Sequence, residues 1–349
     1  MTESRRWAVI DDPATIEPLP LPCYEHLKLI TTPLGVWEHC DHTTPRTEHG
    51  FCTDDNARAL IVLCRQTSKT ADLLELERTY LRFLEHAALP GQGFHNRRGA
   101  DGAWVDAIGS DDSQGRAIWA LGTAARLGST SAIRNAAHEL FAKQSLESPS
   151  PRANAFAILG AREILTCDPT DKHARAAMGR WARHLHAGTA LEWPWPESRL
   201  AYGNARIPEG IIAAGDGLDD ETMISTGLNL LAWLVTSETR DGTFSFTPVG
   251  GWALGESRPG FDQQPTEAAA MADACARAWQ LTAEPSWRDC VIRSGRWLMG
   301  ANDIGIGLYD PISGGCSDGL TASGPSLNQG AESTLAGLSV LQLCQEVMR

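Results

Sequence analysis

Several short polar clusters in this sequence combine neighbouring carboxylates with arginine or asparagine. Asp54 and Asp55 form one pair, Asp111 and Asp112 form a second, and Glu267 belongs to a third cluster. Two carboxyl groups can cleave a glycosidic bond, because one protonates the leaving oxygen while the other acts as nucleophile or as base for water. Their separation is about 5 Å for retention and about 6.5–9.5 Å for inversion. Sugar chemistry is therefore the first hypothesis.

Five polar clusters occupy the same kind of position, directly before a segment expected to be an inner helix. They span residues 50–58, 109–116, 202–209, 262–267 and 328–332. If the helices form a ring, all five clusters face one funnel. The helix dipole also stabilises ionised acids at such positions. The alternative is a structural N-cap, although a cap needs only one acid and two of the clusters contain adjacent acids.

The positions of these residues suggest roles for them. We expect Glu267 to act as general acid, with a pKa raised by partial burial, and Asp54 or Asp55 to act as base on water. A capping box with Gln264 is the structural alternative for Glu267. The residues expected to bind substrate are Arg58, His95, Asp111, Asp112, Gln114, Arg116, Trp195, Tyr202, Asn204, Arg206, Gln329 and Glu332.

Four tryptophans, Trp104, Trp193, Trp195 and Trp252, lie in predicted loops rather than on helix faces. Their rings could stack on the apolar face of a pyranose, or they could plug the floor of the ring. The sequence leaves both alternatives open.

The segment 38–42, with His49 and Cys52, is dense in metal-ligand types. Its His39, Cys40 and His42 match no tight zinc spacing, so we expect no metal and expect the segment to cover the funnel mouth or contact substrate. We expect no cofactor either, because the sequence contains no Walker A motif, Rossmann fingerprint or Gly-x-Ser-x-Gly elbow.

Helices must position these clusters, because apolar residues recur with helical period along most of the chain. The expected helices span residues 54–66, 71–88, 113–127, 130–146, 151–166, 174–187, 221–236, 266–282, 286–300 and 329–347. The expected total is about ten or eleven helices. A strand is expected at 242–248, where Phe244 and Phe246 fall on one side.

Helices rich in Ala and Gly alternate with more charged helices, as residues 113–127 and 71–88 illustrate. Gly115, Gly122 and Ala268 would allow the first kind to approach closely as inner helices. Alternating inner and outer helices in a ring form an (α/α)6 toroid, whereas the alternatives are an open solenoid or an irregular bundle. The expected fold is therefore all-α, an (α/α)6 toroid of helical hairpins with minor β-hairpin insertions.

No linker divides the 349 residues. Residues 1–50 are expected to be an irregular N-terminal arm, with one short helix near 24–29, packed on a barrel. Residues 51–349 are expected to be a single catalytic domain.

Composition excludes several classes of partner. The formal net charge is -13, which disfavours nucleic acid and anionic membranes. No stretch approaches the roughly 20 apolar residues of a membrane span, and the apolar run 7–10 is too short for a signal peptide. Nine cysteines without a CxxC pair fit a reducing cytoplasm. The expected partner is an oligosaccharide or polysaccharide substrate, and a homodimer is left open.

The motifs at 53–58, 110–116, 193–197, 202–206 and 328–332 resemble those of six-hairpin glycosidase-like proteins. Within that group they most resemble the mycobacterial hydrolases of methylmannose polysaccharide. The likeness runs from about residue 50 to the C-terminus. It implies an (α/α)6 fold and an endo-acting α-1,4-mannosidase for partly methylated mannose polymers or their unmethylated precursors.

The resemblance also implies an inverting mechanism with two acids, which match the pair Asp54/Asp55 and Glu267. Related sequences often carry aspartate where this chain has Gly203, so a carboxylate at that position is not available here. Two other functions stay open. A sugar epimerase of the helical-toroid type would use paired histidines, for which His49 and His95 are loop candidates. A non-catalytic glycan-binding partner of a glycosyltransferase would bind oligosaccharide without turnover.

Overall fold

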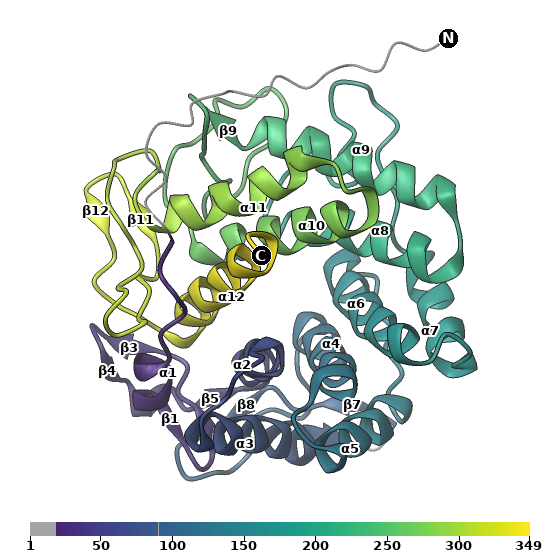
Figure 1. Ribbon diagram of the computed structural model, residues 1–349, viewed down its shortest axis with the longest axis vertical. Helices are drawn as coiled ribbons and strands as arrows, with labels where there is room; N and C mark the ends of the chain where they lie inside the picture. Colours follow the sequence, from purple (N-terminus) through teal and green to yellow (C-terminus); the bar gives the residue numbers. More distant parts are fainter. Residues whose placement is uncertain (1–18, 90) are drawn as a thin grey trace.

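A computed structural model describes residues 19–89 and 91–349, which form two concentric rings of helices (Figure 1). The inner ring contains α2 (Thr53–Arg65), α4 (Asp111–Leu127), α6 (Pro151–Cys167), α8 (Arg206–Leu218), α10 (Pro265–Thr282) and α12 (Ala331–Val347). Outside them lie α1 (Glu25–Leu29), α3 (Ala71–Ala87), α5 (Ser131–Ala142), α7 (Lys172–Ala182), α9 (Glu221–Ser237) and α11 (Pro285–Leu298).

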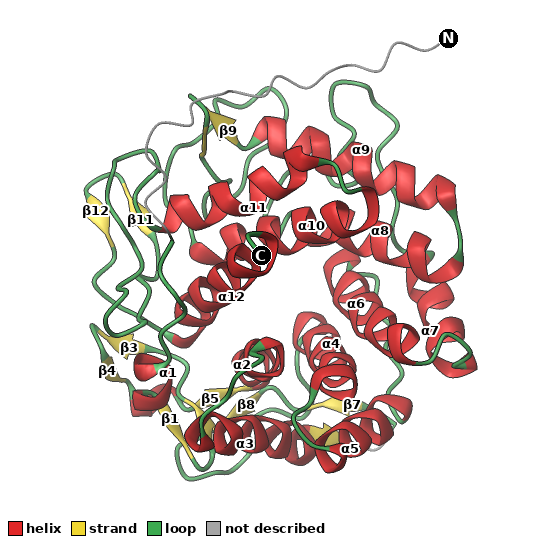
Figure 2. Ribbon diagram, viewed as in Figure 1, coloured by secondary structure: helices red, strands yellow, loops and turns green. Residues whose placement is uncertain are grey.

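Each inner helix packs against the next one in the chain, and α12 packs against α2. The inner ring is therefore closed, which rules out an open solenoid. The prediction of an all-α (α/α)6 toroid is confirmed. The strands are short (Figure 2), and they form antiparallel pairs. The pairs are β1 (Thr31–Thr32) with β2 (Gly35–Val36), β3 (Cys40–Asp41) with β4 (Thr44–Pro45), β5 (Phe51–Cys52) with β8 (Arg97–Arg98), β6 (Ala88–Leu89) with β7 (Gly93–Phe94), β9 (Thr239–Arg240) with β10 (Thr243–Phe244), and β11 (Leu320–Thr321) with β12 (Gly324–Pro325).

Small residues let α4 and α6 approach closely, as the sequence predicts. A Cβ atom at Gly122 would overlap the carbonyl oxygen of Gly160, and one at Gly115 would overlap that of Ala153. By contrast, the charged helix α3 lies in the outer ring, and its Glu75 and Arg78 form an exposed ion pair. The expected strand at 242–248 is partly present as β10, with Phe244 and Phe246 buried and stacked at 5.0 Å.

Helix α8 is absent from the expected set. Its Gly210, Gly215 and Gly217 lower helix propensity, so the segment does not look helical from composition alone. Packing explains two of these glycines. A Cβ at Gly215 would lie 2.7 Å from the backbone nitrogen of Ile224, and one at Gly217 would lie 2.6 Å from the Met178 sulfur.

Two expected helices are too long at their C-terminal ends. The segment 174–187 is helical only to Ala182, and 130–146 only to Ala142. Leu185 and Leu146 are buried beyond those ends. The apolar pattern therefore continues past the last helical residue, which makes the expected helices too long.

The described part of the N-terminal arm contains α1, the pairs β1–β2 and β3–β4, and a 3₁₀ turn at Thr47–His49. The backbone N–H of His26 donates to Ser313, which ties this segment to the C-terminal part of the chain. The apolar run 7–10 lies outside the described residues. None of the described helices combines the length and apolar character that crossing a membrane requires.

Candidate functional site

The first residues of the inner helices meet at one end of the barrel. Contacts join α2 to α4 through Asp54 and Arg116, α2 to α12 through Arg58 and Glu332, and the segment before α8 to α10 through Glu267. A cavity of 240 Å³ lies at this end. Asp54, Asp55, Arg58 and Glu332 line it, so four predicted site residues come together.

Asp55 is a buried carboxylate with both oxygens engaged. The Arg58 guanidinium donates to Oδ1 at 2.8 Å, and the Cys52 thiol donates to Oδ2 at 3.2 Å. Burial raises the pKa of Asp55 to about 7, although Arg58 opposes the rise. The N-cap of α2 is Cys52, whose sulfur accepts from the Asp55 N–H, so neither aspartate of the pair is the cap.

Asp54 is more accessible, with 24% of its side chain exposed. Its Oδ1 lies 3.2 Å from Nε of Arg116, but this oxygen has no well-aligned hydrogen bond to any described residue. Burial of the carboxyl raises the pKa of Asp54, and Arg58 opposes that rise. Because Oδ1 is itself buried, the exposed surface of the Asp54 side chain belongs to its other atoms.

Arg58 connects the acids on two helices. Besides Asp55, it contacts Glu332 at 2.5 Å, and Glu332 is the more exposed partner. Arg58 also lines a narrower cavity of 50 Å³ deeper along the barrel axis, where Arg116 and Arg206 are found. The two cavities therefore adjoin at this guanidinium.

Glu267 lies behind the cavity wall. Its oxygens accept the backbone N–H groups of Gly203 at 2.6 Å and Asn204 at 3.3 Å. Burial, followed by the charge of Glu238, raises the pKa of Glu267 to about 8. Gln264, the N-cap of α10, makes no side-chain capping bond, so the capping-box alternative is wrong. Gly203 lines the narrower cavity, so Glu267 is one residue removed from that wall.

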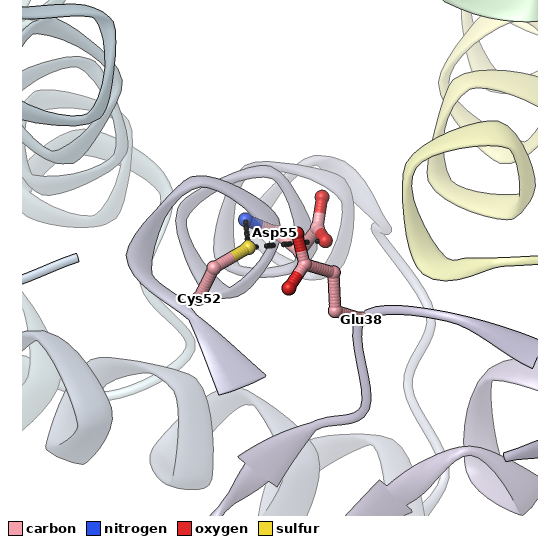
Figure 3. Close-up of side chains that lie close together, drawn as sticks. All are labelled: Glu38, Cys52 and Asp55. Atoms are coloured by element: carbon pink, nitrogen blue, oxygen red, sulfur yellow. Dashed lines mark hydrogen bonds between the residues drawn. The ribbon is translucent and has the colours of Figure 1, made fainter. Parts of the chain in front are cut away.

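Glu38, Cys52 and Asp55 lie close together, as Figure 3 shows. All three line the cavity. One potential ligand atom from each lies within 4.8 Å of the others. Burial raises the pKa of the Cys52 thiol well above its ordinary value, whereas a metal ligand must be a thiolate. Arg58 and Arg97 already pair with Asp55 and Glu38, and they would repel a cation. These contacts favour a thiol that donates a hydrogen bond over a metal ligand.

Three predicted binding residues make contacts that hold the loops. The Gln114 side chain binds both the N–H and the carbonyl of Phe94, and Asp111 accepts from Ser148 at 2.7 Å. Asn204 is fully buried and accepts from the backbone of Ala201 at 2.9 Å. None of the three lines the cavity, because these local bonds turn their side chains away from it.

Three of the four loop tryptophans, Trp193, Trp195 and Trp252, cluster with Trp233. Trp193 makes edge contacts with Trp233 and Trp252, and Trp195 stacks on Trp233 with only 2% of its surface exposed. Trp195 therefore has no open face for a sugar ring and packs instead against Trp233 of outer helix α9.

His95 also lies away from the cavity. It stacks on Trp104 at 5.0 Å, and its Nδ1 lies 2.7 Å from the carbonyl of Asp106. Gln329 does not line the cavity either. Its backbone N–H donates to His42, while its buried Oε1 has no partner among the described residues.

The remaining predicted residues form the wall between α4 and α8. Asp112 lies 3.5 Å from Arg116, and burial raises the pKa of Asp112 while the Tyr202 phenol opposes the rise. Tyr202 is half-exposed. Arg206 binds Asp273 at 2.8 Å and lies 4.6 Å above the ring of Trp119.

Sequence reasoning missed Arg152 at the start of α6, the sixth helix end at this mouth. Arg152 is buried, donates to Glu197 at 2.8 Å and to the carbonyl of Tyr202 at 2.5 Å, and lies 4.8 Å from the Tyr202 ring. An arginine in a first turn opposes the helix dipole. That unfavourable position is the signal that could have identified it. Asp318, which lines the cavity and binds Gly330 at 2.7 Å, carries no comparable signal.

No protein-family model and no curated protein significantly matches this sequence. Several solved structures share its architecture. Cellobiose 2-epimerase from Spirochaeta thermophila DSM 6192 superposes with a TM-score of 0.67 at 14% identity, covering 94% of this chain and 95% of that one. D-mannose isomerase gives 0.63 at 12% identity, covering 93% and 96%. The cellulase Cel9M of C. cellulolyticium gives 0.58 at 11% identity, covering 90% and 88%. The chain thus has the six-hairpin (α/α)6 toroid fold, which it shares at low identity with epimerases, isomerases and cellulases.

Proposed function

We propose that this protein is a glycoside hydrolase whose active site is the cavity at the first turns of the inner helices. The carrying observation is that Asp54, Asp55 and Glu332 line this cavity beside Arg58. Glu267, with its pKa raised to about 8, lies behind the adjoining wall. A site with one accessible carboxylate and one carboxyl protonated at neutral pH has the two forms that glycosidic cleavage requires.

Asp54 is the base in this proposal. Its side chain lines the cavity and is more exposed than that of Asp55, at 24% against 4%. Both oxygens of Asp55 are engaged, so Asp55 orients Arg58 toward the substrate. Glu267 is the general acid, because a carboxyl with a pKa of about 8 holds its proton near neutral pH.

The substrate in this proposal is an α-1,4-linked mannose chain, partly methylated or not, that is cleaved internally with inversion. The sequence resemblance supports the mannose, the linkage and the endo action. The absence of nucleotide and metal motifs in the sequence fits a reaction that needs only the chain's own acids. The fold relatives act on sugars of several kinds, so they do not distinguish among substrates.

Three variants test the assignment on defined α-mannooligosaccharides. We expect Asp54→Asn and Glu267→Gln to lower kcat by about 10²–10⁴-fold. Asp55→Asn should raise KM more than it lowers kcat, because it loosens Arg58. Proton NMR of the first product formed would report inversion or retention at the anomeric carbon. Full activity in both Asp54→Asn and Glu267→Gln would contradict the assignment.

The same incubations separate hydrolysis from epimerisation. An epimerase of the paired-histidine type needs two imidazoles at the sugar, and His39 is the one histidine that lines the cavity among the described residues. Free mannose should therefore be recovered unchanged. Formation of an epimer without chain cleavage would support an epimerase, and tight binding without turnover would support a glycan-binding protein.

A further inference from the structure

A second and larger cavity lies at the opposite end of the barrel, where inner helices end rather than begin. Its volume is 670 Å³, against 240 Å³ for the cavity beside Asp54. Its walls include Arg65 at the end of α2, Leu127 at the end of α4 and Glu346 near the end of α12. Small-molecule sites in proteins typically have about 300–1,000 Å³, so the volume fits a ligand of that size.

Paired charges line this second cavity. The ion pairs connect different inner helices and are Arg65–Asp273, Arg126–Glu163, Arg162–Asp216 and Arg277–Glu209. Arg65 meets Asp273 at 2.7 Å, and Arg162 meets Asp216 at 2.6 Å. Such pairs are held in place before any ligand arrives, and each presents donors and acceptors side by side.

Two buried side-chain amide atoms in this wall lack hydrogen-bond partners among the described residues. They are Oε1 of Gln342 and Nε2 of Gln345. A buried donor or acceptor without a partner costs about 1–3 kcal/mol. The wall therefore holds one donor and one acceptor that a ligand with hydroxyl groups can satisfy if it reaches them.

The charge balance selects the class of ligand. Five arginines and five acidic residues line the cavity. Helix C-termini add partial negative charge. An anion therefore meets no excess positive charge, and a cation would have to displace a guanidinium from its carboxylate. A neutral polyhydroxylated molecule donates to the carboxylates and accepts from the guanidinium groups without breaking a pair.

We propose that this second cavity is an accessory binding site for neutral oligosaccharides, separate from the catalytic mouth. Asp273 lines both this cavity and the narrow one on the barrel axis, so it marks the wall between them. Trp119 strengthens that wall, because the guanidinium groups of Arg206 and Arg65 lie 4.6 Å and 5.6 Å from its ring. The site does not depend on hydrolysis at the other end.

Hydrogen–deuterium exchange of the full chain tests the site, with Asp54→Asn as the background to prevent cleavage. Mannotetraose and maltotetraose are the neutral probes, inorganic phosphate is the anion and putrescine is the cation. We expect the neutral probes to protect peptides covering residues 276–281 and 342–349. Protection of residues 53–58 separately reports the catalytic mouth, so failure of the proposed hydrolase and failure of this site are distinguishable.

Two variants localise the effect. Thr166→Trp places a large ring at the rim, and Gln345→Leu removes an unpaired amide, so each should weaken this binding by about tenfold or more. Thr226→Trp is the matched control, because Thr226 makes the same bond to the carbonyl four residues earlier but lies on outer helix α9. Protection by phosphate or putrescine alone, protection only at residues 53–58, or protection unchanged in both cavity variants would overturn the proposal.

Discussion

Replacement of Asp55 by asparagine should change how the stability of the protein depends on pH. In the folded state the pKa of Asp55 is raised to about 7, whereas an unfolded aspartate titrates near 3.9. The native state therefore favours the protonated form. This contribution to stability is complete below the unfolded pKa and is lost as the pH rises through the folded pKa.

The size of the effect follows from these two pKa values. Linkage gives a loss of about 2.5 kcal/mol in the free energy of unfolding between about pH 5 and about pH 8 for a single group of this kind. The asparagine side chain cannot ionise, so the Asp55→Asn variant should gain about that amount relative to the wild type over the same range. Asparagine keeps an oxygen for Arg58, so any other cost adds a constant offset.

Urea denaturation at several pH values between these limits measures the difference. Asp41→Asn is the matched control, since 78% of the Asp41 side chain is exposed. The control should change the pH dependence little. A constant difference between Asp55→Asn and the wild type across the range would refute the reasoning, because Asp55 would then be ionised in the native state at about pH 5.

Three further changes test separate parts of the structure. Trp195→Ala should lower the free energy of unfolding by about 3–5 kcal/mol while leaving KM near the wild-type value, because the ring packs on Trp233. Denaturation measures the free energy of unfolding, and steady-state kinetics measures KM. A large rise in KM would indicate a sugar-stacking role. Gly122→Ala should cost about 1–3 kcal/mol or more, since the methyl group overlaps α6, and an unchanged melting temperature would contradict that packing. Cys52→Ala removes the thiol donor to Asp55 and should move the pH-dependent stability transition upward, whereas a shift to lower pH would be inconsistent with the Cys52–Asp55 bond.

The positions of most helices could be predicted because their apolar residues repeat with a period set by backbone geometry. The irregular parts could not. The glycines of α8 resemble breakers unless one knows that Ile224 and Met178 lie against them. Likewise, buried Leu185 continues the helical pattern beyond the end of α7 because the non-helical backbone also turns it inward.

The candidate site could be predicted to the level of its helix-leading clusters. Asp54, Asp55, Arg58 and Glu332 line one cavity because their first turns meet at the same mouth. Individual orientations depend on contacts from distant segments. Gln114 turns to the backbone of Phe94, and no spacing within its own cluster encodes that choice.

Two effects compete for the charge of the acids at this mouth, and the structure indicates which one is larger. Helix dipoles favour ionised carboxylates by about 0.3–1 kcal/mol, and by about 2 kcal/mol in the best buried cases. Burial of a carboxyl can raise its pKa by up to about 3–5 units, which is several kcal/mol in the other direction. The pKa values of Asp55 and Glu267 are both raised, so burial outweighs the dipole and the arginine charges. First-turn position therefore predicts where these acids lie, while the depth of each one predicts which of them keeps its proton at neutral pH.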